Sequence, residues 1–307
     1  MDADQDIART VAIVIAVRNG MPHVVEAVQS ALAQGPAVRS VVVVDDGSLD
    51  GTRATIAAIA DSRLLVVANP GRGVSSARNA GVEASASQWL LFLDADDRLT
   101  EGAVDALLVA AHDDSVIVYG DYERIDKAGH PFGRRHLMRK ARNKPSGDVL
   151  DVLLAGNIFI NGGLLICSRR AFEEVGGFDK SLTLCEDWHL WCRLAAQGPV
   201  HYVARRVMDY RVHETSTMMK SARRYDDFSP AIQAIFKDAR IRRLCEADKL
   251  SRLRRHGEVS LMTYCAQQSL RAGNFAQGAA MALSAVGHFP AKAPWVLTRV
   301  AGALASL

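Results

Sequence analysis

Several features that mark secreted, zinc-stapled or nucleic-acid-binding proteins are scarce in this sequence. It contains five cysteines in 307 residues. Their number is odd and their spacing is not that of a zinc site, which argues against a disulfide framework and favours a reducing compartment. The 37 lysines and arginines nearly balance the 34 aspartates and glutamates, giving a net charge of +3. A charge this small gives no reason to expect a nucleic-acid partner.

Long hydrophobic runs are also missing, although a bilayer-spanning helix needs about 20 apolar residues. The first apolar run, Val11–Val17, is short and follows an acidic start rather than the basic leader of a signal peptide. The apolar stretch Pro294–Leu307 is also too short, and it carries Arg299. We therefore expect a cytoplasmic, globular protein, in line with 49% apolar and 23% charged residues.

What the first half contains is a regular alternation of apolar runs with segments of helical spacing. The apolar runs, rich in β-branched residues, predict strands at Val11–Val17, Ser40–Val44, Leu64–Ala68, Trp89–Leu93 and Val116–Tyr119. The segments between them predict helices, the last of which is expected to start after a cap at Thr100. This alternation predicts an α/β fold with a doubly wound, mostly parallel, Rossmann-like sheet. Ligands of such sheets bind at the carboxyl ends of the strands.

Carboxylates follow two of the predicted strands. Asp94, Asp96 and Asp97 stand within four positions, and like charges so close repel one another unless something compensates them. Carboxylate oxygens suit Mg²⁺ or Mn²⁺, so the cluster predicts a divalent cation, with a solvated acidic turn as the alternative. Asp45 and Asp46 end the second strand, and they either converge on the same ligand or simply form a turn.

A third polar segment, from Gly71 to Gly81, opens a predicted helix with glycines, hydroxyls and the two arginines Arg72 and Arg78. A helix start offers free N–H groups and a positive dipole end, and arginine adds a fork that suits phosphate. The segment therefore indicates an anion site, with a polar helix start as the alternative. It matches neither GxGxxG nor a Walker loop, which counts against a dinucleotide oxidoreductase or an ATPase.

Seven short motifs, taken together and in order, resemble those of the family 2 glycosyltransferases, which are inverting enzymes of the GT-A fold. The motifs are the first strand with Asn19, Asp45–Asp50, Gly71–Gly81, Asp94–Asp97, Gly176–Asp179, Glu186–Trp188 and Tyr210–His213. The resemblance extends over roughly residues 10–215. It implies a GT-A catalytic domain over residues 1–219, and the helical patterns that follow predict a C-terminal extension over residues 220–307.

The resemblance also implies a reaction and its residues. A sugar would pass with inversion from a nucleoside-diphosphate sugar to a hydroxyl of a glycan, polysaccharide or lipid-linked acceptor, with Asp187 as the catalytic base. A single displacement needs one base and no covalent intermediate. The implied donor-binding residues are Val17, Asn19, Asp45, Asp46, Arg72, Arg78, Asp94 and Ala95, and the implied ligands of Mn²⁺ or Mg²⁺ are Asp94, Asp96, Asp97 and His213.

Four residues are assigned to the acceptor side. Asn161 and Gly162 begin a small-residue stretch that lets an acceptor approach the backbone, unless they form a bulged strand. Glu186 and Trp188 flank Asp187, although Trp188 has the helical spacing of a core residue.

Glu186 has a structural explanation of its own. Thr183 and Glu186 have the spacing of a capping box, in which Glu186 reaches back to the start of its helix. No such explanation applies to Asp187, and the helix dipole would keep an aspartate in a first turn ionised. Asp187 is therefore the better candidate for chemistry.

Two basic stretches suggest further contacts. Residues 220–256 contain eleven basic and five acidic residues, a surplus of +6 in a chain whose total is +3. Attraction to anionic lipid contributes about 1 kcal/mol of binding free energy per basic residue near the membrane surface. We therefore hypothesise a peripheral contact with the cytoplasmic face of the membrane, and a helical cap on the catalytic domain is the alternative. The run Arg134–Lys144 is a solvated loop, or one that closes over a diphosphate or meets a lipid headgroup.

Two other functions stay open. A nucleotidyltransferase would also join acidic ligands to a doubly wound sheet, but it predicts a glycine-rich basic loop after the first strand, which Val17–Met21 lacks. A catalytically silent module that binds nucleotide sugars is the non-enzymatic alternative, and the presence of Asp187 argues against it. The sequence indicates neither the donor sugar nor the oligomeric state.

Overall fold

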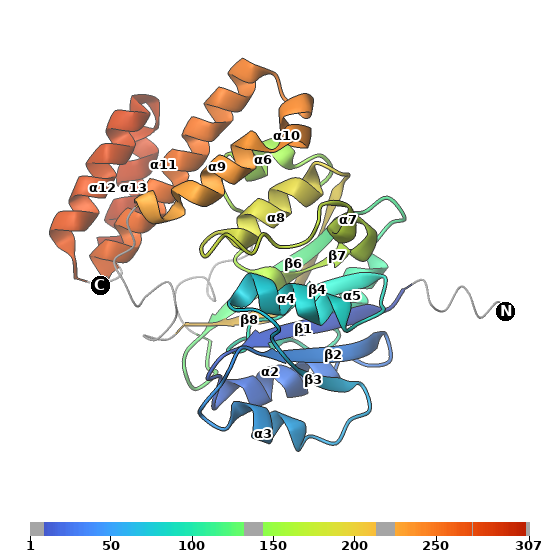
Figure 1. The fold of residues 1–307 in the computed structure, drawn as a ribbon. Coiled ribbons are helices and arrows are strands. Elements are labelled where there is room, and N and C mark those ends of the chain that lie inside the picture. The colour runs from blue at the N-terminus through green and yellow to red at the C-terminus, as the bar shows by residue number, and fades with distance from the viewer. Residues whose placement is uncertain (1–8, 132–143, 213–224, 272, 305–307) are drawn as a thin grey trace.

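A computed structural model describes residues 9–131, 144–212, 225–271 and 273–304. Its centre is one eight-stranded sheet in the order β3-β2-β1-β4-β7-β6-β8-β5, with helices packed against it (Figure 1). The strands are β1 Val11–Val17, β2 Val38–Asp45, β3 Leu64–Ala68, β4 Trp89–Phe92, β5 Arg98–Leu99, β6 Ile117–Ile125, β7 Leu165–Ser168 and β8 Val200–Arg211.

The predicted α/β fold is confirmed, and the sheet is mixed in its second half. Strands β3, β2, β1 and β4 are parallel neighbours. Strand β7 runs antiparallel to β4 and β6, whereas β6 and β8 are parallel and β5 is antiparallel to β8. The parallel half is buried on both faces, since Val41 and Val43 join the main core whereas Val42 and Val44 pack with Ala77. This explains the unbroken apolar runs in the sequence.

Helices connect the strands at close to the predicted positions. They are α2 His23–Leu32, α3 Thr52–Ala57, α4 Val74–Glu83, α5 Ala103–Val109, α6 Leu150–Leu154, α7 Arg169–Glu174 and α8 Glu186–Ala195. The predicted cap at Thr100 is wrong. Helix α5 begins at Ala103 after Gly102, whose φ of 66° is left-handed, and the Thr100 hydroxyl donates instead to the carbonyl of Arg206 at 2.7 Å.

The predicted C-terminal extension is helical, as expected. It contains α9 Ser229–Lys237, α10 Ala239–Leu244, α11 Ala247–Arg271, α12 Phe275–His288 and α13 Ala293–Leu304. Helix α9 packs on α8, and Ile232 and Ile235 belong to the same core as the sheet. A smaller second core joins α11, α12 and α13. None of the helices described combines the length and apolar character needed to cross a bilayer. A domain boundary after residue 219 stays a prediction.

Candidate active site

The loops that follow β1 and β2 are joined at the carboxyl edge of the sheet. The Asp46 backbone N–H donates to the carbonyl of Val17 at 2.8 Å. The Asn19 backbone N–H donates to Oγ of Ser48 at 2.9 Å, and its Oδ1 accepts from the N–H of Leu49 at 2.8 Å. The two segments assigned to the nucleotide from separate motifs therefore form one continuous surface.

Asp46 also anchors the loop that leads into α4. Its Oδ1 accepts from Nδ2 of Asn69 at 2.7 Å, and its Oδ2 accepts from the N–H of Gly73 at 3.0 Å. Asn69 in turn accepts from the Ser76 hydroxyl at 2.9 Å. Asn69 was not among the predicted site residues, although the Asn-Pro pair that begins with it, just after β3, is a turn signal in the sequence. The same loop exposes Arg72 to solvent.

The three aspartates after β4 form a compact oxygen-only cluster. One carboxylate oxygen from each of Asp94, Asp96 and Asp97 lies within 4.8 Å of the others. Burial raises the pKa of Asp94 and raises that of Asp97 well above its usual range, and the charge of Asp96 raises both further. Such a set fits a hard divalent cation, which takes oxygen ligands and whose charge would offset this repulsion.

Asn161, which lies just before β7 in the chain, holds this cluster through its side-chain amide. Its Nδ2 donates to Oδ2 of Asp94 at 3.1 Å and to Oδ2 of Asp97 at 2.5 Å. The side chain is only 6% exposed, so it orients carboxylates, and the predicted acceptor contact does not fit its position. Gly162 begins a short 3-10 helix at residues 162–164, where an added Cβ would stand 2.8 Å from the carbonyl oxygen of Phe92. A glycine is therefore required here because the backbone packs closely on β4, and the predicted role in acceptor binding is not needed to explain it.

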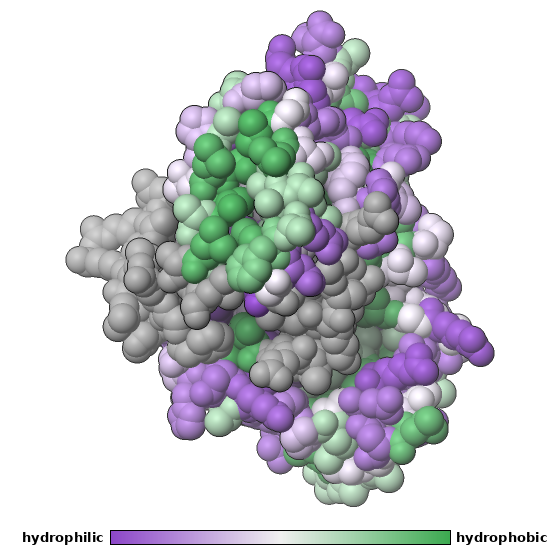
Figure 2. Space-filling model, turned by 90° about the vertical axis from the view of Figure 1, so that its left-hand side faces the viewer, coloured by the Kyte–Doolittle hydropathy of each residue, from purple (hydrophilic) through white to green (hydrophobic). Residues whose placement is uncertain are grey.

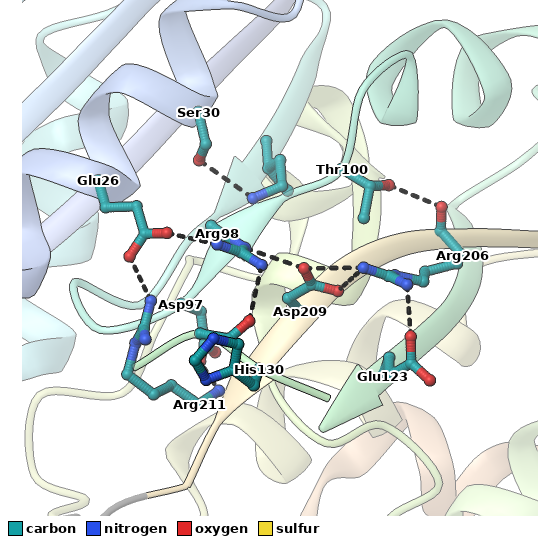
Figure 3. A network of polar contacts seen from close by, with 12 residues as sticks. Glu26, Ser30, Asp97, Arg98, Thr100, Glu123, His130, Arg206, Asp209 and Arg211 are labelled. Atoms are coloured by element: carbon teal, nitrogen blue, oxygen red, sulfur yellow. Dashed lines mark hydrogen bonds and ion pairs between the residues drawn. The ribbon is translucent and has the colours of Figure 1, made fainter. Parts of the chain in front are cut away.

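Arg211 supports the cluster from β8. Its backbone N–H donates to Oδ1 of Asp97 at 2.7 Å, and its Nε donates to the carbonyl of Asp96 at 2.8 Å. The guanidinium is 2% exposed and pairs with Glu26 on α2, which also pairs with Arg98 at 2.6 Å (Figure 3). Arg98 continues the network to Asp209, whose second partner is Arg206. The sequence shows Arg211 only as part of a motif, and it gives no sign of Glu26.

We expect Glu26→Gln to destabilise the fold, because it removes the charge that compensates the buried guanidinium of Arg211. Loss of one partner of a buried pair costs about 3–5 kcal/mol, and the partial exposure of Glu26 reduces this to roughly 1–3 kcal/mol. Urea denaturation measures the difference. Glu174→Gln, which breaks the exposed pair with Arg170, is the matched control and should change the unfolding free energy by less than about 1 kcal/mol. Equal effects of the two changes would contradict the role given to Glu26.

Arg78 bridges the acidic cluster to the start of α8. The buried guanidinium donates through Nη2 to Asp94 at 2.8 Å and through Nη1 to Glu186 at 3.0 Å. The predicted capping box at Thr183 is therefore wrong. Helix α8 begins at Glu186 itself, with Cys185 before it at a φ of 55° and no side-chain cap. Glu186 instead forms an ion pair with Arg78, and both terminal nitrogens of Arg78 are bonded to carboxylates of the protein.

Two motifs far apart in the sequence meet beside this ion pair. Nδ2 of Asn79 donates to the carbonyl of Phe178, and Oδ1 of Asn79 accepts from the N–H of Phe178, both at 2.9 Å. The guanidinium of Arg78 lies over the Phe178 ring, 5.1 Å from its centre. Gly177 has a φ of 70°, and a Cβ there would stand 2.8 Å from Oδ1 of Asn79. These contacts fix α4 against the segment before α8.

Asp187 lies in the first turn of α8, half-buried among the charges of the site. Burial raises its pKa to about 7, with a further rise from Glu186 and an opposing effect of Arg78. The expectation that the helix dipole keeps this aspartate ionised is therefore wrong near neutral pH, because the cost of burying the charge is larger. Its Oδ1 accepts from the N–H of Trp188 at 2.6 Å. The Trp188 ring is 2% exposed and donates to the carbonyl of Leu153 at 2.7 Å, so it belongs to the core and the predicted acceptor contact does not fit.

Of the remaining predicted residues, Asp45 and Ala95 are described by the structure and His213 is not. Asp45 is buried, and its carboxylate accepts from the N–H of Ser48 at 3.1 Å, so it stabilises its own turn. Ala95 is half-buried between two aspartates of the cluster. His213 and most of the basic run, residues 132–143, lie outside the described residues.

Solved structures with the same arrangement define the class of fold. The chain matches the structure of S. aureus TarS 1-349 in complex with UDP-GlcNAc with a TM-score of 0.66, at 14% identity over 96% of this chain and 89% of that one. It also matches the mannosyltransferase PcManGT from Pyrobaculum calidifontis in complex with GDP-Man and Mn²⁺, with a TM-score of 0.62 and 19% identity over 97% and 80% of the two chains. The fold is GT-A.

The family follows from the sequence match. The model of Glycosyl transferase family 2 matches residues 12–176, and the chain belongs to this family. The succinoglycan biosynthesis protein ExoU of Rhizobium meliloti (strain 1021) is 34% identical over 203 residues, which are 61% of this chain and 57% of that protein. An uncharacterized glycosyltransferase of Rickettsia typhi is 28% identical over 223 residues, or 71% and 69% of the two chains.

Proposed function

We propose that this protein is a metal-dependent inverting glycosyltransferase that uses a nucleoside-diphosphate sugar. The observation that carries the proposal is the oxygen cluster of Asp94, Asp96 and Asp97 at the end of β4, with the half-buried carboxylate of Asp187 within reach of the same charges. Two structural neighbours, one in complex with UDP-GlcNAc and the other with GDP-Man and Mn²⁺, support a donor of this class.

The proposed donor site follows the carboxyl edge of the sheet. Asn19 and Asp46 form the surface for the nucleoside, and buried Val17 supports it through its carbonyl, which accepts from the backbone N–H of Asp46. Exposed Arg72 lies beside the start of α4, where no side chain caps the first turn. Free N–H groups and a positive dipole end there favour a diphosphate. The three aspartates after β4 would hold Mn²⁺ or Mg²⁺, which neutralises charge on the departing diphosphate.

The proposed base is Asp187. A carboxylate takes the proton of the acceptor hydroxyl as that oxygen attacks the anomeric carbon, and a pKa of about 7 is close to the operating pH that makes such a base efficient. Glu186 has its charge paired with Arg78, so it positions α8 against Asp94 rather than competing for the proton. His213 remains a proposed further metal ligand.

The proposed acceptor is a growing polysaccharide of the cell envelope, carried as a lipid-linked molecule on the cytoplasmic face of the membrane. Relatives whose names refer to succinoglycan biosynthesis support a polysaccharide. A hydroxyl on such an acceptor would enter on the side of Asp187. The half-buried carboxylate there has one oxygen engaged with the backbone of its own helix.

Melting temperatures of the protein with UDP- and GDP-sugars, with and without Mn²⁺, test the proposal first. A ligand that binds only the folded state raises its stability, so one donor should raise the melting temperature only when Mn²⁺ is present. Release of nucleoside diphosphate from that donor then separates an enzyme from a silent binding module. Binding without release would favour the module, and release of pyrophosphate from a nucleoside triphosphate and a sugar phosphate would favour a nucleotidyltransferase.

A further inference from the structure

The outward face of α12 and α13 is unusually apolar for a surface. These helices pack inward on α11 through a small core that includes Ala282, Ala285 and Val296. Of the eleven large apolar side chains exposed among the described residues, five lie on this helix pair: Phe275, Leu283, Trp295, Leu297 and Leu304. Figure 2 shows apolar surface gathered over these helices, beside more polar parts of the same side. A patch of this kind indicates an interaction surface.

The formal charges carried by these two helices and the turn between them have one sign. The sequence contains no aspartate or glutamate after Glu258, whereas Arg271, Lys292 and Arg299 all follow it. Glu258 itself is 5% exposed and pairs with Arg254 at 2.9 Å and with His288 at 2.6 Å. Glu258 is therefore buried and compensated, and the formal charges between Phe275 and Leu304 are the cations Lys292 and Arg299.

Trp295 stands where the apolar and the cationic groups meet. Nζ of Lys292 lies 5.1 Å from the centre of its ring, and the guanidinium carbon of Arg299 lies 5.4 Å from it. Tryptophan prefers the boundary between hydrocarbon and water, and the long stems of lysine and arginine reach from apolar surroundings to charged headgroups. An apolar helix face with this border has the composition of a helix that lies in a membrane interface.

We propose that the outward face of α12 and α13 rests on a bilayer containing anionic lipid. Strand β1 points its carboxyl end toward the side of the molecule where α12 and α13 lie (Figure 1), so the membrane would face the edge of the sheet that carries the site. This orientation rests on the proposed function, because it is useful only if the acceptor is lipid-linked. The surface differs from the basic stretch of residues 220–256, whose described part ends within α11.

Vesicle co-sedimentation of the full chain tests the proposal. Wild type should bind vesicles of phosphatidylcholine with phosphatidylglycerol more strongly than vesicles of phosphatidylcholine alone, and high salt should weaken the preference. Leu297→Glu should lower the partition coefficient about tenfold or more. It removes a large apolar side chain and adds a negative charge, which the anionic lipid repels. Val109→Glu is the control, because Val109 is an apolar side chain on α5 that is 81% exposed and lies outside both basic stretches, and it should retain binding.

Three results would overturn the proposal. Wild type that binds no vesicle would do so, as would equal loss of binding in the two variants. The third result is dimerisation through this face. Light scattering would then show a dimer that Leu297→Glu dissociates, and the protein would not bind vesicles. Nucleoside diphosphate release with a soluble acceptor is measured in parallel. Its absence in a wild type that binds vesicles would contradict the proposed function and leave the membrane surface standing.

Discussion

Asp187→Asn is expected to lower turnover by about 10²–10⁴-fold, the usual contribution of a positioned base. The change is nearly isosteric and keeps an oxygen for the N–H of Trp188, so the fold and donor binding should persist. Steady-state transfer rates measure the loss, and the melting temperature and donor affinity verify the fold. Asp105→Asn is the matched control, since Asp105 also lies in the first turn of a helix but is exposed.

The pH dependence of the same reaction provides a second readout. The base acts when deprotonated, and burial holds the pKa of Asp187 at about 7. Turnover of wild type should therefore rise as the pH increases through about 7 and level off above it. The residual activity of Asp187→Asn should lack this rise. Near-normal turnover of Asp187→Asn, or the same pH profile in both proteins, would contradict the assignment.

Glu186→Gln is expected to be damaging for a different reason. It weakens the ion pair with Arg78, which also holds Asp94, so donor binding should suffer as well as turnover. Asp187→Asn should affect turnover alone. If Glu186→Gln, with an intact fold and donor affinity, reduced turnover more than Asp187→Asn did, the base would have to be reassigned to Glu186.

Asp96→Ala is expected to abolish the contribution of the metal to donor binding. Calorimetry of the donor with Mn²⁺ and with chelator should show strong binding only for wild type with Mn²⁺. The loss should be at least about 10–100-fold, which is what changes to the second shell of a metal site alone can cause. Asp113→Ala, a change at an exposed carboxylate remote in sequence from the cluster, should keep the response to Mn²⁺. Equal donor affinity of wild type and Asp96→Ala, each measured with Mn²⁺ and with chelator, would contradict the proposed metal site.

The parallel half of the fold could be predicted because its signals are local. Unbroken runs such as Val11–Val17 identify strands that are covered on both faces, and the polar residues that follow them mark the carboxyl edge of the sheet. The crowding of Asp94, Asp96 and Asp97 needs no tertiary information, because three charges within four positions cannot separate far. Family, fold class and acidic cluster were all available at this level.

The partners of those residues were decided by the tertiary structure alone. Glu186 pairs with a residue 108 positions away, and Arg211 pairs with one 185 positions away. The capping-box spacing of Thr183 and Glu186 is a local pattern, but the helix starts after left-handed Cys185, two residues too late to form the box. Which charged side chain meets which depends on how the strands and helices are packed. The sequence by itself therefore determined which groups surround the edge of the sheet, and only packing decided that Asn161 holds carboxylates, because buried polar atoms take the partners that the folded chain brings within reach.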